Sequence, residues 1–289
     1  MKLISTKGFA DYELLDSGNG LRLERFGKYT ISKPDPQAIW KPSFSQSKWN
    51  DCDAKFENNV WLKKPGFPQK WIVKYRNLNL FAKLTPFKHT GIFPEQSLNW
   101  DFIEQKINSQ ANGQKSLSNT QTHILNLFAY TGASSLIAAA SGAKVTHVDA
   151  SKPSIFWAKE NQALSGLSEK PIRYILDDAI EFCAREIKRG IKYDGIIMDP
   201  PVYGHGPKGQ VWDFSKNFSI LLYSCSKLLS DNPLFVIANA YAVSFSAVML
   251  KNLYEDYFPK GNLEYGELAL EQRNGRFLST GIFSRLSFI

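Results

Sequence analysis

The fold of this chain is decided by the apolar strand and turn Ile124-Leu125-Asn126-Leu127-Phe128-Ala129-Tyr130-Thr131-Gly132. Beyond residue 98, such strands alternate with helical stretches, which is typical of a parallel sheet covered by helices on both faces. We predict strands at 123–128, 144–148, 173–176, 195–198 and 234–238, and helices at 101–109, 134–141, 153–165, 179–188, 218–229 and 246–257. A polar connector is expected at 113–122. Two final strands, at 264–271 and 277–288, complete a doubly wound, seven-stranded α/β sheet with a terminal antiparallel hairpin.

The first third of the chain is predicted to be a small β-rich domain, residues 1–97, ahead of a catalytic domain at 98–289. A hairpin is expected at 12–33 and short strands at 33–70, and the alternating stretch 71–84 should pair with this hairpin. Residues 1–100 hold 16 of the 35 Lys and Arg, 9 of the 27 acids and five of the seven tryptophans. Basic residues next to aromatics, as at Lys70-Trp71, suit RNA, whose bases can stack. An aromatic core with solvated lysines is an equal alternative.

The overall composition, with 43% hydrophobic and 21% charged residues in 289, is that of a soluble globular protein. No apolar stretch approaches the ~20 residues that span a bilayer, and the first residues carry no secretory signal, so we expect a cytoplasmic protein without a membrane partner. Three widely spaced cysteines, Cys52, Cys183 and Cys225, predict neither a disulfide nor a metal site. Cys183 and Cys225 fit core positions of helices.

A carboxylate followed by two prolines closes the fourth strand, in Asp199-Pro200-Pro201-Val202-Tyr203. Proline fixes φ, lacks an N–H and keeps the preceding residue extended, so the Asp199 carboxylate and the Pro200 carbonyl would be rigid acceptors. Two such acceptors can grip an NH2 group and aim its lone pair, which in a base is otherwise delocalised into the ring. With the Gly132 turn, this suggests methyl transfer to a planar nitrogen. An ordinary Pro-Pro strand exit is the alternative.

Three other residues at turns or strand ends suit a nucleoside. Gly132 permits close approach of a ligand to the backbone, yet its turn lacks the G-x-G-x-x-G pattern of a dinucleotide site. Asp149 ends the second strand, where an acid can accept hydrogen bonds from both ribose hydroxyls. Asp178 fits either an adenine amino contact or the cap of the next helix. A plain turn glycine and a plain capping acid are the alternatives for Gly132 and Asp149.

In combination, residues 125–132, Val148-Asp149-Ala150-Ser151, Asp178 and Asp199-Pro200-Pro201 resemble the large-subunit ribosomal RNA methyltransferases, a family with cytosine-C5 and guanine-N methylating members. The resemblance covers roughly residues 87–289. It implies S-adenosylmethionine (SAM) as cofactor and RNA, ribosomal RNA in particular, as partner. It also implies roles for individual residues. Asp149, with Ala150 and Ser151, would hold the ribose, and Asp178, with Ala179, the adenine. Asn126, Phe128, Tyr130, Thr131 and Gly132 would surround the methionine part, and Asp199, which also borders SAM, would bind the target base with Pro200 and Pro201.

The chain also departs from the family pattern in two places. Residues 90–96 resemble its Thr-Gly-x-Phe-x-x-Gln segment, which flanks the SAM pocket and adds Thr90, Phe93 and Gln96 to the expected site. Pro94-Glu95-Gln96-Ser97 stands where Leu-Asp-Gln-Arg is more usual, which leaves the role of that arginine open. Cytosine-C5 members place a nucleophilic cysteine after the fifth strand, because C5 is activated only by covalent attack at C6. This chain has Ala238-Asn239-Ala240-Tyr241 there.

The resulting hypothesis is a SAM-dependent RNA methyltransferase that acts on an exocyclic amine and needs no metal. Asp199, Pro200 and Pro201 would hold the amine, and Tyr203 would stack on the base. The glycine-rich segment 203–212 either closes over a flipped-out nucleotide or is a plain mobile loop. Two rivals stay open: a methyltransferase for a protein amide or a small amine, and a non-catalytic RNA-binding factor that keeps the fold. The oligomeric state is not predicted.

Overall fold

The computed structural model describes residues 1–6, 9–113, 121–241 and 244–288, so most of the connector expected at 113–122 lies outside the described residues. The chain divides into two compact units. We call residues 1–4, 99–268 and 281–289 the α/β unit, and residues 5–98 and 269–280 the β-rich unit. The predicted boundary after residue 97 placed residues 1–4 in the β-rich domain and residues 269–280 in the catalytic domain. The structure groups each of these two segments with the other unit.

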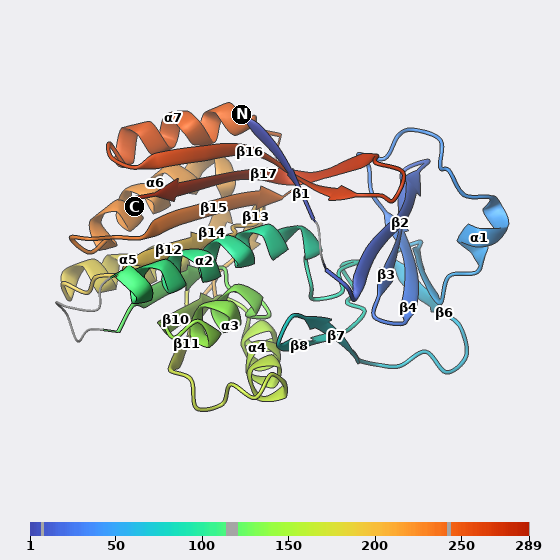
Figure 1. Cartoon of the computed structure of the whole chain (residues 1–289), viewed down its shortest axis with the longest axis horizontal. Coiled ribbons are helices and arrows are strands. Elements are labelled where there is room, and N and C mark those ends of the chain that lie inside the picture. The colour runs from blue at the N-terminus through green and yellow to red at the C-terminus, as the bar shows by residue number, and fades with distance from the viewer. Residues whose placement is uncertain (7–8, 114–120, 242–243, 289) are drawn as a thin grey trace. The chain divides into compact units, whose positions relative to one another are not determined.

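An eight-stranded sheet forms the centre of the α/β unit (Figure 1). Its strands, in spatial order, are β1 (Lys2–Ser5), β16 (Asn262–Glu271), β17 (Phe277–Ser287), β15 (Phe235–Tyr241), β12 (Gly195–Met198), β9 (His123–Leu127), β10 (Lys144–Asp149) and β11 (Ile172–Leu176). The five adjacent strands β15, β12, β9, β10 and β11 run parallel to one another, whereas β17 runs antiparallel to β15. The predicted doubly wound sheet with its terminal hairpin is confirmed, and β1 is an eighth strand that was not predicted.

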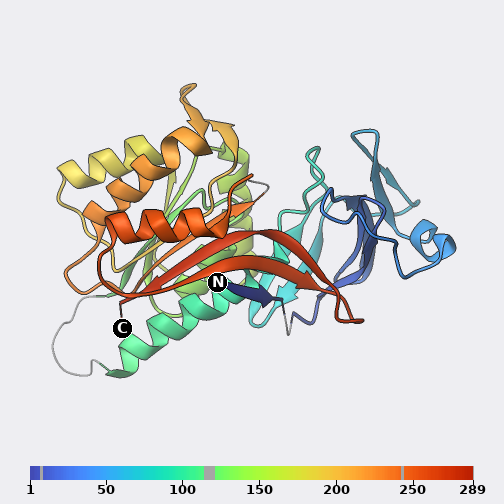
Figure 2. The same ribbon diagram turned by 90° about the horizontal axis from the view of Figure 1, so that it is seen from above.

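Helices cover both faces of this sheet (Figure 2). Alternate residues of the strands, such as Leu125, Met198 and Val236, pack in one core with α5 (Ala179–Lys188), α6 (Phe214–Leu228) and α7 (Ala247–Tyr257). On the other face lie α2 (Ser97–Gly113), α3 (Ala133–Ala140) and α4 (Lys152–Leu164). Cys183 and Cys225 are fully buried in the first core and unpaired, which confirms their assignment to helix core positions.

The β-rich unit contains two separate sheets and one short helix, α1 (Gln46–Asn50). The larger sheet consists of β2 (Tyr12–Gly18), β3 (Leu21–Phe26), β4 (Tyr29–Pro34), β5 (Ala54–Glu57) and β6 (Val60–Lys63). The predicted hairpin of β2 and β3 is confirmed. The prediction that 71–84 pairs with it is wrong: β7 (Trp71–Tyr75) and β8 (Leu78–Ala82) pair with each other. The turn at Arg76, which has φ of 49°, folds this stretch back on itself.

The tryptophans of this unit are structural. Trp49 and Trp71 are buried, and their indole N–H groups donate to Asp16 Oδ2 and Phe26 O. The half-buried indoles of Trp40 and Trp61 likewise donate to backbone carbonyls within the unit. The aromatic-core interpretation therefore holds for these side chains. Exposed lysines remain on the surface of the unit; they are Lys28, Lys41, Lys48, Lys63, Lys64, Lys70 and Lys74.

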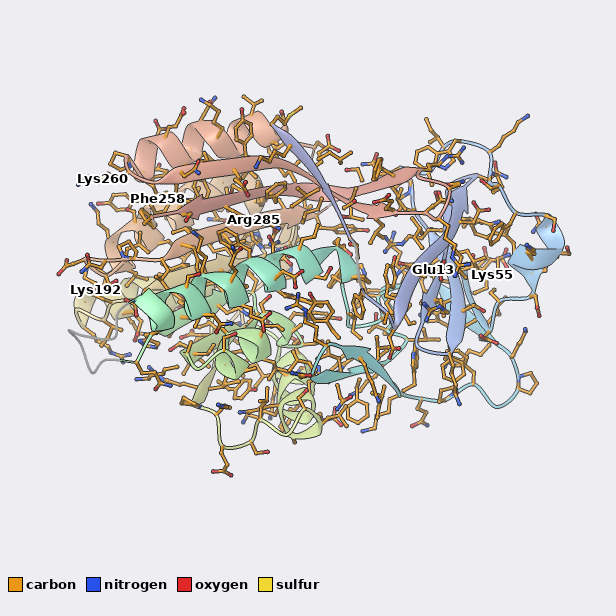
Figure 3. The ribbon with its side chains drawn as sticks, viewed as in Figure 1. Glu13, Lys55, Lys192, Phe258, Lys260 and Arg285 are labelled. Atoms are coloured by element: carbon orange, nitrogen blue, oxygen red, sulfur yellow. The ribbon has the colours of Figure 1, made fainter. Side chains whose placement is uncertain are left out.

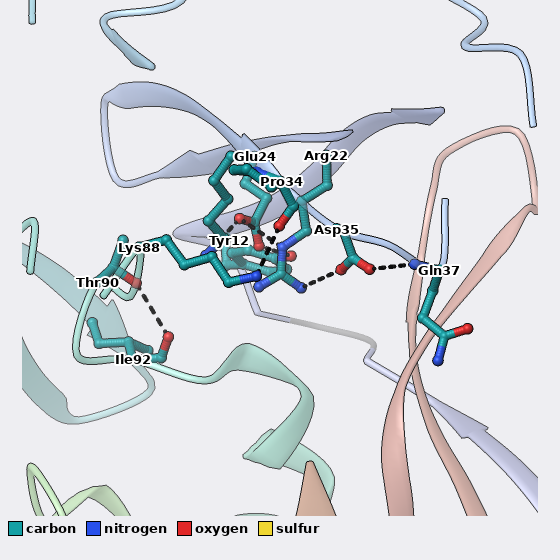
Figure 4. A network of polar contacts seen from close by, with 10 residues as sticks. Tyr12, Arg22, Glu24, Pro34, Asp35, Gln37, Lys88, Thr90 and Ile92 are labelled. Atoms are coloured by element: carbon teal, nitrogen blue, oxygen red, sulfur yellow. Dashed lines mark hydrogen bonds and ion pairs between the residues drawn. The ribbon is translucent and has the colours of Figure 1, made fainter. Parts of the chain in front are cut away.

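A buried group of charged side chains lies inside the β-rich unit (Figure 4). Glu24 accepts from the Tyr12 hydroxyl at 2.9 Å and pairs with Lys33 Nζ at 2.9 Å and Arg22 Nε at 3.3 Å. Arg22 also reaches Asp35 Oδ2 at 3.4 Å. Burial alone raises the pKa of Glu24, yet the charges of Arg22 and Lys33 bring it below its ordinary value. The group therefore links β2, β3 and β4 through a hydroxyl hydrogen bond and ion pairs, beside the apolar side chains of the same strands.

Candidate active site

The predicted site residues gather mainly at one edge of the sheet in the α/β unit. Because β9, β10, β11 and β12 are parallel neighbours, the turns after their carboxyl ends lie side by side. The residues brought to this edge are Phe128, Tyr130, Thr131, Gly132, Asp149, Ala150, Ser151, Asp178, Ala179, Asp199, Pro200 and Pro201. The structure thus brings to one edge of the sheet residues that lie up to 73 positions apart in sequence.

Asp149, the last residue of β10, is held by two backbone donors. Its Oδ2 accepts from Tyr130 N at 2.7 Å and its Oδ1 from Ser151 N at 2.8 Å. Burial raises the pKa of this carboxyl, and the two N–H groups offset part of the rise. Each carboxylate oxygen keeps a further lone pair, so the side chain can accept from a vicinal diol. Ser151 has a different task, since its hydroxyl caps α4 by accepting from Ser154 N.

The turn after β9 has a strained backbone. Phe128 and Tyr130 both adopt positive φ, 54° and 50°, which is rare for bulky residues and is found mostly where surrounding contacts enforce it. Gly132 has φ of 89°, and a Cβ there would lie 2.9 Å from Cβ of Ala158 on α4. Glycine is therefore required by its backbone conformation and by the close approach of α3 to α4. Burial raises the pKa of Tyr130 to about 12, aided by the charge of Asp149.

Asn126 lies inside β9 rather than at its end, and it is buried. Its Nδ2 donates to Ser135 Oγ at 2.9 Å, and that hydroxyl is 3.0 Å from His147 Nδ1. These three side chains join β9, α3 and β10 beneath the turn. Asn126 thus supports the turn from below.

Asp178 serves as the N-cap of α5. Its Oδ1 accepts from Ile180 N at 2.9 Å and from Glu181 N at 3.0 Å. Oδ2 takes no hydrogen bond within the described ranges, so capping does not exhaust this carboxylate. The backbone N–H of the preceding residue, Asp177, donates to Asp149 O at 3.1 Å. Asp178 and Asp149 therefore lie at the ends of adjacent strands. The capping interpretation of Asp178 is confirmed, and its second oxygen can still accept from an amine.

The predicted acceptor segment follows β12 directly. Pro200 is buried and Asp199 is half-buried, while Pro201 is exposed. The Pro201 carbonyl accepts from Trp212 Nε1 at 2.6 Å. The Pro200 carbonyl accepts no hydrogen bond from the part of the chain that the structure describes.

The glycine-rich segment after the prolines is a β-hairpin, not the loop expected from its sequence. Strands β13 (Tyr203–His205) and β14 (Val211–Asp213) pair in antiparallel register, with Gly204 opposite Trp212. Tyr203 is 58% exposed and meets the His205 ring edge-on at 5.3 Å. Trp212 faces the other way and is buried. Trp212 was not predicted to contribute to the site, because the glycines and the proline ahead of it make the segment look like a loop.

Asn239 lies within β15, the strand beside β12. Since Met198 pairs with Ala238, Asn239 follows in register with Asp199. Its Oδ1 accepts from Asn99 Nδ2 at 2.9 Å, and Asn99 Oδ1 accepts from Arg285 Nε at 2.6 Å. Arg285 is labelled in Figure 3. Burial lowers the pKa of Arg285 to about 10. A buried polar chain therefore stands where a cytosine-C5 enzyme would need a thiol.

Three predicted cofactor residues belong to the β-rich unit. Thr90 is buried and its hydroxyl donates to Ile92 O at 3.2 Å. Phe93 meets the His89 ring at 5.2 Å, and Gln96 ends the short 3-10 helix η1 (Pro94–Gln96), just ahead of α2.

The acceptors at this edge of the sheet are compatible in kind with the donors of SAM. Carboxylate oxygens such as those of Asp149 and Asp178 accept from hydroxyl and amino groups, and the turn at Phe128–Gly132 adds two aromatic side chains. Within the described ranges no group of three or more His, Cys, Asp or Glu side chains could hold a metal ion. In the same ranges, no helix has the length and apolarity to cross a membrane.

Comparison with solved structures defines the class. No family model matches the chain. The chain superposes over its whole length on a SAM-dependent methyltransferase from Agrobacterium tumefaciens, with a TM-score of 0.94, 36% identity and 94% of that chain covered. SMU.776, solved with S-adenosylhomocysteine, shares the fold at a TM-score of 0.73 and 20% identity, over 97% of this chain and 76% of that one. The chain belongs to the SAM-dependent methyltransferases, with SAM as its cofactor.

Among curated proteins, the similar ones carry a more particular name. Ribosomal RNA large subunit methyltransferase K/L of Shewanella frigidimarina is 34% identical over 158 residues, which is 54% of this chain and 20% of that protein. The protein of the same name from Shewanella baltica is 35% identical over 158 residues, with the same shares covered. The chain therefore spans about one fifth of the length of these relatives.

Proposed function

We propose that this enzyme transfers the methyl group of SAM to an exocyclic amine of a base in RNA, in particular ribosomal RNA. The observation that carries the proposal is the acceptor segment at the end of β12, where the Pro200 carbonyl and the Asp199 carboxylate lie beside the cofactor turn. The names of the curated relatives support RNA as the substrate class. An enzyme with this substrate would work in the cytoplasm.

The acceptor segment suits an NH2 group because both of its hydrogens need acceptors. Donation to Asp199 and to the Pro200 carbonyl would pull the amine out of conjugation and point its lone pair away from the two protein oxygens. SAM supplies a methyl group on a positively charged sulfur. The amine lone pair forms the N–C bond as the C–S bond breaks, the electron pair stays on sulfur, and the nitrogen releases one proton, for which the Asp199 carboxylate is an acceptor. Catalysis would come mainly from orientation.

Cytosine C5 is disfavoured as the target because no cysteine is available. Attack at C6 requires an accessible thiolate. Cys183 and Cys225 are fully buried in the core of the α/β unit, and Cys52 lies buried in the β-rich unit. Burial raises the pKa of Cys52, which further disfavours its thiolate. An amine target needs no covalent intermediate, so the same site can act without a thiol.

Substrate contacts are proposed for two surfaces. Tyr203, exposed and two residues after Pro201, would stack on the target base. In the β-rich unit, exposed lysines such as Lys63 and Lys74 would contact phosphates. Because the tryptophans of that unit are committed to its interior, we assign them no role in stacking on RNA.

The test is incubation of the purified protein with SAM labelled in its methyl group and total cellular RNA, followed by digestion and mass spectrometry of the nucleosides. We expect label in an N-methylated nucleoside and a loss of about 100-fold in rate for Asp199→Ala. Asp231→Asn is the matched control, since it removes an exposed acid at the opposite end of the sheet. Label in 5-methylcytosine, or label in protein but not in RNA, would overturn the proposal.

A further inference from the structure

We infer that Trp212 is a positioning residue, which sets the acceptor segment at a fixed distance from the cofactor turn. The inference rests on the proposed function of the acceptor segment and adds a residue to it. Trp212 lies at the centre of β14 and is 3% exposed. Because side chains alternate along a strand, Trp212 points inward while its neighbours Val211 and Asp213 and their partners His205 and Tyr203 share the outer face.

The first contact of Trp212 restrains the acceptor segment. Its indole N–H donates to the Pro201 carbonyl at 2.6 Å. The ring of Pro201 already fixes φ at this residue, and the hydrogen bond fixes the direction of its carbonyl. Pro200 is confined in turn, since a residue before proline is kept extended. The two prolines thus limit the direction of the Pro200 carbonyl, and the indole fixes the carbonyl that follows it, so the end of the acceptor segment is tied to β14.

The second contact of Trp212 restrains the cofactor turn. Its ring meets Phe128 edge-on, with centroids 4.8 Å apart and planes at 60°. Phe128 is the first residue of the turn after β9 and holds a positive φ of 54°. A bulky residue keeps such a conformation only when its surroundings enforce it, and Trp212 is part of those surroundings. The same side chain thus touches both the segment proposed for the amine and the turn that borders SAM.

The two contacts use different parts of the indole, so they can be separated. A tryptophan needed only to fill the core would be replaced by phenylalanine with little effect on turnover. A positioning residue that acts through its N–H would lose the bond to Pro201 while keeping the ring contact to Phe128. Trp212→Phe is therefore the decisive variant.

Tyr193→Phe is the matched control, because it also deletes one buried hydrogen bond in the α/β unit, from the hydroxyl to Glu186 Oε2 at 2.7 Å. Methylation assays with labelled SAM and total RNA give kcat and the KM for SAM for each variant. For Trp212→Phe we expect kcat to fall about tenfold, with the KM for SAM and the melting temperature within the range of Tyr193→Phe. Equal kcat values for the two variants would overturn the inference.

A crystal structure of Trp212→Phe provides a readout that does not depend on turnover. We expect the Pro201 carbonyl to be rotated or disordered in the variant, with a shift of the acceptor segment relative to the turn after β9, and an unchanged carbonyl and segment would contradict the inference. If wild-type protein labels another acceptor instead of RNA, the proposed substrate fails while the two variants can still be compared on that acceptor. The failures of the two proposals are thus distinguishable.

Discussion

At the scale of single residues, the site consists of acids whose orientation is fixed by the backbone. Asp149 is the clearest case, because Tyr130 N and Ser151 N bind one oxygen each. Such a carboxylate is preorganised, because its side chain is already fixed and loses little conformational entropy when it accepts hydrogen bonds from a diol. Asp178 is held in the same way through a single oxygen.

Replacing Asp149 by Asn should weaken cofactor binding, because one acceptor oxygen becomes an NH2 donor that faces the N–H group of Tyr130 or of Ser151. Hydrogen bonds to a charged group contribute about 1.5–3 kcal/mol, so the Kd for S-adenosylhomocysteine should rise about 10-fold to 100-fold. Isothermal titration calorimetry measures this change, with Asp231→Asn as control. A Kd equal to that of wild type would remove Asp149 from the cofactor site.

His147 should make the protein sensitive to acid. It is fully buried, and burial lowers its pKa to about 3, against 6.5 in the unfolded chain. Between these values the unfolded chain binds more protons, so the free energy of unfolding falls as the pH drops from about 6.5 towards 3. Urea unfolding at pH 7 and pH 5 should show wild type losing about 1–2 kcal/mol more than His147→Gln. Equal losses would mean that His147 is accessible to protons when folded.

At the scale of elements, α5 shows how one residue can serve both structure and ligand. Asp178 caps the helix with Oδ1 and leaves Oδ2 for a ligand. Asp178→Ser should keep the cap but lose the second acceptor, whereas Asp178→Ala should lose both and cost about 1 kcal/mol of stability.

We therefore expect the serine variant to unfold like wild type yet to bind S-adenosylhomocysteine more weakly, as the alanine variant does. Thermal unfolding and calorimetry on the same samples measure the two effects. A serine variant with wild-type affinity would leave Asp178 with capping alone.

The sequence predicted well those elements whose ends carry a strong local signal. The bounds of α5 and β12 agree with the structure, because a capping acid begins the first and a proline pair follows the second. The hairpin of β13 and β14 could not be predicted, since Gly206, Pro207 and Gly209 make its turn look like a loop. The self-pairing of β7 and β8 depends on a left-handed turn at Arg76, a residue without turn preference.

The positions of the acids proposed for the site could be predicted from sequence, whereas the contacts of the aromatic residues could not. Acids at the ends of parallel strands must converge, so Asp149, Asp178 and Asp199 follow from the strand pattern alone. The inward side of a hairpin depends on its register, so Trp212 could not be assigned a partner from sequence. The burial of Trp49 and Trp71 likewise depends on tertiary packing, which basic and aromatic composition does not report.

At the scale of the whole molecule, only part of the positive charge lies on the surface, where it can attract a polyanion. The chain has a net charge of +8, but Arg22 and Lys33 are buried in ion pairs and cannot attract a polyanion. The remaining exposed lysines of the β-rich unit would bind RNA through phosphate contacts, independently of base sequence.

RNA methylation should accordingly fall steeply with salt. Raising the salt concentration from 50 to 200 mM should lower the rate at limiting RNA at least about tenfold, as expected for several phosphate contacts, while the affinity for S-adenosylhomocysteine stays nearly constant. Filter binding and labelling across a salt series measure both. A flat dependence would point to a protein or a small amine as the substrate.

The central claim is that a donor bound at the turn after β9 faces an amine held at the end of β12. A crystal structure with bound S-adenosylhomocysteine tests it most directly. We predict that Asp149 accepts from the ribose hydroxyls and that the sulfur faces the Pro200 carbonyl and Asp199. A ligand bound elsewhere, or a Pro200 carbonyl directed away from the sulfur, would contradict the account.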